Sequence, residues 1–249
     1  MKKALVTLFF VVIVLAATMG FRAFTVFEDH QPEPAAGYAQ VRIDEEASVQ
    51  RFAEALTFPT VSFDDRNRFD AETFRDFHDF LERAYPRISE RATRTVVADY
   101  SLVYHLEGSD AALEPVLFMS HFDVVPVEEI TLGEWTHAPF GGVVQDGIVW
   151  GRGSVDDKIG VIALMESLES LLAEGFRPRR SLYFAFGHDE EVGGLEGAAS
   201  VAKYFEGQGI RFDFVLDEGG AVTQGMLEGI DHPVAIIGIS EKGYVNLVL

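Results

Sequence analysis

The stretch LYFAFGHDEEVGG, residues 182–194, has five apolar or aromatic residues, one glycine, and then a histidine and three consecutive acidic residues. A short apolar run of this length, followed by glycine, predicts a buried strand over 182–186. His188 and the acidic residues after it then lie where that strand ends. Ionisable groups at such a point are costly unless solvent, an ion-pair partner or a metal compensates them. The stretch therefore predicts a polar site at one edge of a sheet.

The rest of the chain alternates strands with helices around this stretch. Apolar residues recur at helical spacing in four segments, and short apolar runs between them predict strands. The predicted helices lie near 49–56, 74–84, 161–172 and 195–205, and the predicted strands at 95–97, 101–106, 116–119, 148–150, 214–216 and 234–239. This order predicts an α/β fold, with a mostly parallel sheet covered by helices on both faces.

Composition limits the kind of protein and its partners. The chain has 249 residues, 48% of them hydrophobic, which is enough for a large folded core. Its formal charge is −20, from 20 basic and 40 acidic residues, so we expect no nucleic acid partner. It has no cysteine, which excludes disulfides, thiolate zinc sites and a cysteine nucleophile.

The N-terminus predicts export. Lys2 and Lys3 precede an uncharged apolar stretch over 4–21, and Arg22 follows. Eighteen helical residues span about 27 Å, near the shortest length that crosses a bilayer. We expect residues 1–27 to be a signal anchor that holds the protein in a membrane facing outside the cytoplasm. A cleaved signal peptide, with a secreted product, is the alternative. The polar, proline-bearing residues 28–44 predict a linker.

Polar clusters follow an apolar strand or open a helix at four places. The clusters are His121 with Asp123, Asp156 with Asp157, Glu190 with Glu191, and Asp217 with Glu218. In α/β sheets, ligands bind beyond the carboxyl ends of the strands, so we expect these groups to meet there. Gathered carboxylates repel each other unless a cation joins them. Imidazole and carboxylates without thiolate suit zinc, with manganese or cobalt as alternatives.

The spacing within each cluster agrees with a metal site but leaves other interpretations open. His121 and Asp123 are two residues apart, so on an extended segment both face the same way. Asp123 can then hold one ring nitrogen of His121 while the other binds a metal. Taken alone, His121 could equally be a solvated loop residue, Asp156 a helix N-cap and Glu190–Glu191 an acidic turn.

Four motifs, in this order, resemble the M20 family of metallopeptidases. They are SHFDVVP (120–126), GRGSVDDK (151–158), GHDEEVGG (187–194) and LDEGG (216–220). The stretch 135–158 and the phrase ISEKGYVNL (239–247) resemble its carboxypeptidase S branch, which includes N-fatty-acyl-amino-acid hydrolases. The resemblance covers residues 49–249 and implies a zinc-exopeptidase-like catalytic domain.

The resemblance also implies a role for each residue of the clusters. His121 binds one metal and Asp123 orients it. Asp156 bridges two zinc ions, and the Asp156–Asp157 peptide is often cis in such enzymes. Glu190 is the general base and Glu191 a ligand. Asp217 or Glu218 supplies a further ligand, with Glu218 favoured.

The resemblance implies that a lid or dimerisation domain follows, and after it a last histidine ligand. We therefore expect an N-terminal fragment, with the catalytic domain over 45–240 and the start of the lid over 241–249. A homodimer through the missing lid is implied in the same way. This chain alone is then expected to lack a ligand and, with it, activity.

The predicted function is hydrolysis of an amide bond next to a free carboxylate, in a peptide or an N-acyl amino acid. Two dications would activate the water, and Glu190 would take its proton. The alternatives are a membrane-tethered, non-catalytic metal- or ligand-binding module, and a related M20 dipeptidase or deacylase.

Overall fold

The computed structural model describes residues 2–25, 41–219, 222–226 and 229–238, and the chain divides into two compact units, 1–40 and 41–249. In the first unit the helix α1 (Lys2–Thr25) is long and apolar enough to cross a membrane. Its residues 5–22 have a mean hydropathy of 2.2, and none is buried. A signal sequence has the same properties, so the anchor and the signal peptide both remain predictions.

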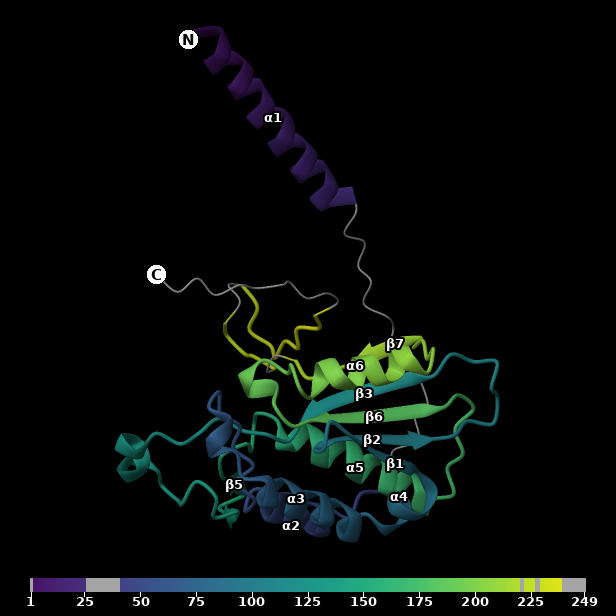
Figure 1. The fold of residues 1–249 in the computed structure, drawn as a ribbon. Coiled ribbons are helices and arrows are strands. Elements are labelled where there is room, and N and C mark those ends of the chain that lie inside the picture. The colour runs from purple at the N-terminus through teal and green to yellow at the C-terminus, as the bar shows by residue number, and fades with distance from the viewer. Residues whose placement is uncertain (1, 26–40, 220–221, 227–228, 239–249) are drawn as a thin grey trace. The chain divides into compact units, whose positions relative to one another are not determined.

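The second unit holds the remaining helices and all the strands of the described residues (Figure 1). Its helices are α2 (Glu45–Ala55), α3 (Ala71–Ala84), α4 (Pro86–Arg91), α5 (Lys158–Ala173) and α6 (Ala198–Gly207), with the short 3-10 helices η1 (Arg66–Arg68), η2 (Glu129–Glu134) and η3 (Glu190–Val192). Its strands are β1 (Thr93–Val97), β2 (Ser101–Leu106), β3 (Val116–His121), β4 (Val143–Gln145), β5 (Ile148–Trp150), β6 (Leu182–Gly187) and β7 (Phe214–Leu216).

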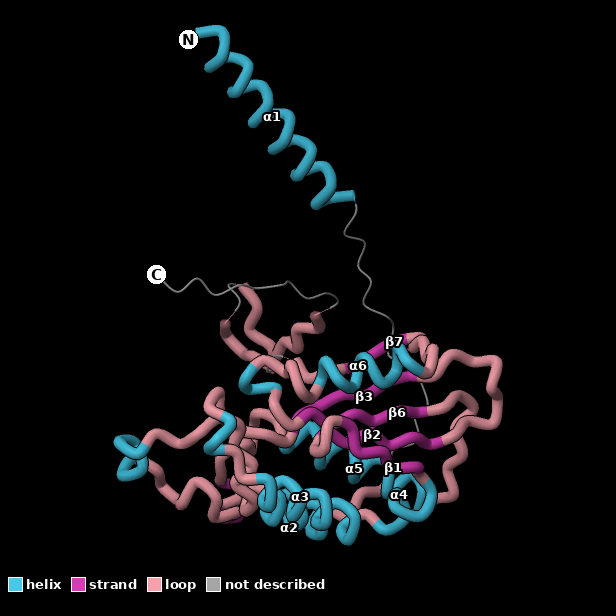
Figure 2. Tube along the Cα trace, in the orientation of Figure 1, coloured by secondary structure: helices cyan, strands magenta, loops and turns pink. Residues whose placement is uncertain are grey.

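Five strands form the main sheet, in the order β1-β2-β6-β3-β7. The pairs β6–β3 and β3–β7 are parallel, whereas β2 is antiparallel to both of its neighbours. Four strands therefore run one way and β2 runs against them. The α/β prediction is confirmed, and the sheet is mixed because the hairpin between β1 and β2 reverses the chain. Figure 2 shows the strands as one layer between helices.

Helices cover both faces of this sheet, unequally. On β2, Leu102 and Tyr104 point to the face covered by α2–α5, and Val103 points to the other face, as the twofold period of a strand requires. The larger core on the first face holds Phe74 and Phe77 of α3 with apolar residues of α5. On the second face, α6 is the one helix of the described residues that packs on the sheet (Figure 1).

Besides the three short 3-10 helices, two elements were not predicted from the sequence. Pro86 ends α3 but also opens the short helix α4, because a proline fits the first turn of a helix, where its missing N–H has no partner to lose. The strand β4 pairs with β5 across Asp146 and Gly147, both with positive φ (55° and 78°). Asp-Gly is the usual sequence of such a two-residue hairpin turn.

The strand β7 forms an edge of the main sheet, and no other strand of the described residues pairs with its outer side. Its three residues are each about half exposed, at 49%, 51% and 53%. The predicted strand over 234–239 is wrong for residues 235–238. Val234 makes an isolated bridge to Thr223, and the apolar residues after it have no partner strand among the described residues. Residue 239 and the predicted lid start, 241–249, lie outside the described residues, so the lid and its dimer stay predictions.

Candidate metal centre

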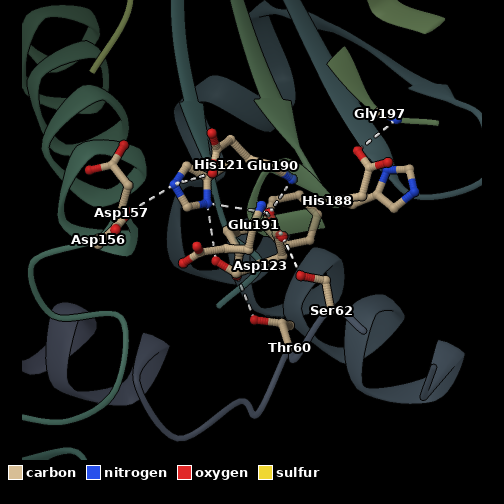
Figure 3. A network of polar contacts seen from close by, with 12 residues as sticks. Thr60, Ser62, His121, Asp123, Asp156, Asp157, His188, Glu190, Glu191 and Gly197 are labelled. Carbon is tan, nitrogen blue, oxygen red and sulfur yellow. Dashed lines mark hydrogen bonds and ion pairs between the residues drawn. The ribbon is translucent and has the colours of Figure 1, made fainter. Parts of the chain in front are cut away.

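The predicted polar clusters meet where three parallel strands end. His121 is the last residue of β3 and pairs with Gly187, the last residue of β6. His188 to Glu191 follow β6, and Asp217 and Glu218 follow β7, which pairs with β3. Parallel strands end at the same edge of a sheet, so these segments converge there. Figure 3 shows the side chains that follow β3 and β6, among them His121, Asp123 and Glu190.

The imidazole of His121 lies at the centre of the group and is 2% exposed. Its Nδ1 is 3.3 Å from a carboxylate oxygen of Asp123 and 3.1 Å from the Asp123 carbonyl oxygen. Its Nε2 faces the other way, 3.0 Å from Oδ1 of Asp156 (Figure 3). The two nitrogens therefore have separate partners, one buried and one at the surface of the site.

Glu218 and Glu190 approach the same Nε2 from two other segments. The Glu218 Oε2 lies 3.5 Å from it and the Glu190 Oε2 lies 3.8 Å from it. One ligand atom from each of His121, Asp156 and Glu218 lies within 4.8 Å of the others, a spacing that could hold one metal ion.

Asp217 differs from its neighbour. Its Oδ1 accepts the N–H of Glu218 at 2.9 Å, so its carboxylate is engaged by the local backbone, although the residue lines the same cavity. Glu191 contacts the site through its main chain, since its N–H donates to Asp123. Among the described residues the structure therefore brings together one imidazole and three carboxylates, with Asp217 and Glu191 beside them.

The charges of the site raise the affinity of its acidic groups for protons. Burial and the nearby Asp156 raise the pKa of Glu191 to about 7. Burial, opposed by His121 but reinforced by Asp157 and Asp156, raises the pKa of Glu218 to about 7. Burial also raises the pKa of Glu190. Such shifts in a cleft are typical of functional sites.

His121 responds to the same charges in the opposite sense. Burial disfavours its charged form, but the hydrogen bond and charge of Asp123, together with Glu218 and Glu190, outweigh burial. They raise the pKa of His121 to about 10. Without a metal, the positive charge on the imidazole is what holds these carboxylates together.

The turn before α5 carries Asp156, and the hydrogen bonds of Asp157 to Ser120 and Gly160 hold this turn in place. Asp157 caps α5, since its Oδ1 accepts the N–H of Gly160, and its Oδ2 accepts the hydroxyl of Ser120 at 2.7 Å. The N-cap is therefore Asp157, and the side chain of Asp156 stays 65% exposed and turns to His121. The Asp156–Asp157 peptide bond is cis, as the family resemblance implies.

Lys158, which follows them, is completely buried. Its Nζ donates to the carbonyl oxygens of Ala55 (3.0 Å) and Phe58 (2.5 Å) at the end of α2. Burial lowers the pKa of Lys158 to about 7. The burial of Lys158 was not predicted from the sequence, although a lysine at the start of an otherwise apolar helix is a signal for it. Ser62 was missed as well, and nothing in the segment 59–62 marks it.

A cavity of about 760 Å³ opens over the cluster. His121, Asp156, Glu190 and Glu218 line one part of it. Phe118, Met119, Ile159 and Leu164 line another part, which is apolar. A polar group within an otherwise apolar cleft of this size is typical of a small-molecule site. The donor set, one imidazole with oxygen ligands and no sulfur, fits zinc or a similar dication.

Comparison with known proteins gives a family match. Residues 117–236 match peptidase family M20/M25/M40. The chain is 45% identical over 204 residues to probable carboxypeptidase S-like 2 of Dictyostelium discoideum; this alignment covers 80% of the chain and 39% of the relative. The chain is 39% identical over 203 residues to the N-fatty-acyl-amino acid synthase/hydrolase PM20D1 of Xenopus tropicalis; this alignment covers 81% of the chain and 39% of the relative. The chain thus spans about two fifths of the length of these relatives.

Solved structures agree on the fold. The M20 family metallo-carboxypeptidase Sso-CP2 of Sulfolobus solfataricus superposes with a TM-score of 0.56 at 20% identity, over 70% of this chain and 38% of that one. Human carnosine dipeptidase 1 gives 0.54 at 21% identity, with the same coverage. These structures confirm the fold. The family match over 117–236 and the two relatives confirm the family resemblance read from the sequence.

Proposed function

The chain carries a domain of peptidase family M20/M25/M40, and from that premise we propose that the protein is a metal-dependent hydrolase of amide bonds. The observation that carries the proposal is the convergence of His121, Asp156 and Glu218 within 4.8 Å, at the ends of separate elements. These residues are far apart in the sequence, so local structure does not explain why their side chains lie together. Binding of a shared cation would explain it.

The proposed ligands are His121, Asp156, Glu191 and Glu218, and the proposed metal is a pair of zinc ions. When bound, dications would polarise the amide carbonyl and increase the acidity of a water molecule. Asp123 holds the Nδ1 of His121, so that Nε2 is the nitrogen presented to the site. The geometry leaves Asp217 as an additional acidic group beside the ligands.

Glu190 is the proposed general base. Its carboxylate lies at the edge of the cluster, 51% exposed, where it can reach water and a substrate as well as His121. Its raised pKa makes it a better proton acceptor than an ordinary carboxylate. Glu190 would take a proton from water as that water attacks the amide carbon, and it would return the proton to the departing amine.

The proposed substrate class is a peptide or N-acyl amino acid with a free carboxylate next to the scissile amide. The names of the relatives, carboxypeptidase S-like and N-fatty-acyl-amino acid synthase/hydrolase, support it. We further propose that the protein is exported and that α1 either anchors it or is removed as a signal peptide, which the apolar stretch over 5–22 supports.

The test separates the base from the ligands. Glu190→Gln should keep the zinc content of the protein and lower kcat by about 10²–10⁴-fold, because a neutral amide cannot take the proton. His121→Ala and Asp156→Ala should each lose zinc. Metal content is measured by elemental analysis. Hydrolysis of peptides and N-acyl amino acids is measured on a chain extended by the predicted lid and its last histidine ligand.

Glu174→Gln, an exposed carboxylate at the end of α5, is the control and should change neither quantity. Full hydrolysis by Glu190→Gln would refute the proposed base. Zinc retained by His121→Ala at unchanged stoichiometry would refute the proposed ligand set.

A further inference from the structure

Asp123 makes more contacts than the orientation of one histidine requires. Its carboxylate is completely buried and has four hydrogen-bonding neighbours. Besides the Nδ1 of His121, its Oδ1 accepts the N–H of Glu190 and its Oδ2 accepts the N–H of Glu191, both at 3.1 Å. The same carboxylate therefore holds the imidazole and the main chain of the turn that bears the two glutamates.

The fourth neighbour is the hydroxyl of Ser62, which donates to Oδ2 of Asp123 at 2.6 Å (Figure 3). Ser62 is 1% exposed, so no solvent competes for this bond. It is the shortest of the four contacts and the only one that comes from outside the segments carrying the predicted ligands and base. A hydrogen bond to a buried carboxylate is stronger than one between neutral groups.

The backbone around Ser62 is itself fixed against the segment that carries Asp123. The N–H of Ser62 donates to the carbonyl oxygen of Val124, and the N–H of Val124 donates to the carbonyl oxygen of Thr60. The hydroxyl of Thr60 adds a bond of 2.5 Å to the carbonyl oxygen of Phe122. Residues 60–62 thus lie beside 122–124 as a short parallel pairing, which presents the Ser62 hydroxyl to Asp123 in one position.

We propose that Ser62 is a positioning residue, which acts on the metal centre through the carboxylate of Asp123. Its hydroxyl fixes the rotation of that carboxylate. The carboxylate in turn fixes the imidazole of His121 and the turn over 190–191. The part of this inference that concerns metal binding rests on the function proposed above, whereas the part that concerns the turn does not.

The physical reason is the geometry of the two oxygens. Without the hydroxyl, Oδ2 keeps only the N–H of Glu191, and a buried carboxylate with an unsatisfied lone pair turns or draws in water. Either change weakens both hydrogen bonds that the N–H groups of Glu190 and Glu191 donate to Asp123, as well as the contact to His121. Groups that hold metal ligands in this way typically change metal affinity about 10–100-fold when they are removed.

The first test measures the turn in the metal-free full chain. Ser62→Ala should speed amide hydrogen exchange of Glu190 and Glu191 about tenfold, because their acceptor is no longer held. Ser62→Thr keeps the hydroxyl and should retain the slow exchange. Tyr85→Phe is the matched control, since it also removes a buried hydroxyl that donates to a carboxylate, that of Glu166 at 2.9 Å.

The second test measures zinc affinity in the same variants. Ser62→Ala should bind zinc about 10–100-fold more weakly, while Tyr85→Phe should lower the melting temperature and leave zinc affinity unchanged. Ser62→Ala with unaltered exchange at 190–191 would overturn the proposal, as would an equal loss of affinity in Tyr85→Phe. If neither the unmutated chain nor a chain extended by the predicted lid binds zinc, the proposed function fails, and the exchange measurement alone decides the role of Ser62.

Discussion

Protons occupy the cluster around His121 when no metal does. The pKa of Glu191 and that of Glu218 are both raised to about 7, and that of His121 to about 10. Near neutral pH the imidazole therefore carries a proton, and the two carboxyl groups are partly protonated. A metal that uses these groups as ligands has to displace those protons.

Zinc affinity should accordingly depend on pH with two slopes. Between pH 8 and pH 7 mainly His121 is protonated, so affinity should fall about tenfold per unit. Below pH 7 the two glutamates gain protons as well, so the fall should steepen toward about a thousandfold per unit. Zinc titrations from pH 6 to pH 8, with proton release measured by calorimetry in two buffers, would check this.

Glu218→Gln is the matched variant for that measurement. It removes one of the titrating groups, so its slope below pH 7 should be smaller by about one proton per zinc. A single constant slope over the whole range, in the unmutated protein, would contradict the protonation states described here.

For individual residues, the sequence predicts contacts between side chains that are close along the chain. The spacing of His121 and Asp123 is enough to place both on one side of an extended segment. The sequence could not choose between Asp217 and Glu218, because the residue that turns inward depends on where β7 ends. Ser62 was out of reach, since its bond joins residues 61 apart through an isolated pairing that no periodicity reveals.

The helix α5 connects the packing of the fold to the site. Its first turn contains Gly160, and a Cβ there would lie 2.5 Å from Oδ2 of Asp157 and 2.8 Å from the hydroxyl of Ser120. The hydroxyl of Ser120 donates a hydrogen bond to Oδ2 of Asp157, and this bond fixes the turn that carries Asp156. The absence of a side chain at residue 160 is therefore what lets the helix begin so close to the site.

Gly160→Ala should destabilise the fold by about 1–3 kcal/mol, as overpacking of a closed site does. It should also weaken zinc binding, because Asp157 must move and Asp156 moves with it. Thermal unfolding and zinc titration are the measurements.

Gly207→Ala, in the last turn of α6 with nothing within 4 Å of its Cβ position, is the control. It should keep zinc affinity and hold or raise the melting temperature, because alanine favours helix over glycine. If Gly160→Ala matched Gly207→Ala in both quantities, the close packing around residue 160 would have no role in the site.

Elements with a strong repeating pattern were predictable, and elements that depend on one turn were not. The apolar spacing in α5 and the run in β6 are long enough to stand out. The strand β4 is only three residues long and exists because the turn at Asp146–Gly147 returns the chain onto it. The direction of β2 relative to β6 depends on which strands become neighbours, and that information lies between distant segments.

The two units of the molecule differ in what covers their apolar residues. The two hydrophobic cores found among the described residues are formed by residues of the unit 41–249. The residues of α1 over 5–22 are all unburied in their own unit, and apolar residues need either a protein partner or a lipid one.

A chain that begins at Val41 should therefore keep its fold, with a melting temperature within about 2 °C of that of the chain 1–249, because it retains the residues of both described cores. Expressed in cells, the full chain should sediment with membranes and the shortened chain should not. Far-ultraviolet circular dichroism, thermal unfolding and carbonate-washed membrane fractions are the measurements.

The chain 1–249 with the substitutions Val11→Lys and Ile13→Lys is the control, and it should lose the membrane association. N-terminal sequencing distinguishes the two fates of α1. A membrane-bound product that retains residues 1–25 supports the anchor, and a soluble product that lacks them supports a signal peptide. A soluble product that retains α1 would contradict both.

The outer edge of β7 has a consequence for how the protein behaves at high concentration. Half-exposed apolar residues, beside backbone groups that pair with no other strand of the described part of the chain, favour strand-to-strand pairing between molecules. The formal charge of −20 opposes that pairing, since approaching copies repel each other. Colloidal stability thus depends on long-range repulsion, which added salt screens and acidification neutralises. The protein should therefore resist aggregation best in dilute solutions of low ionic strength, at a pH above neutral.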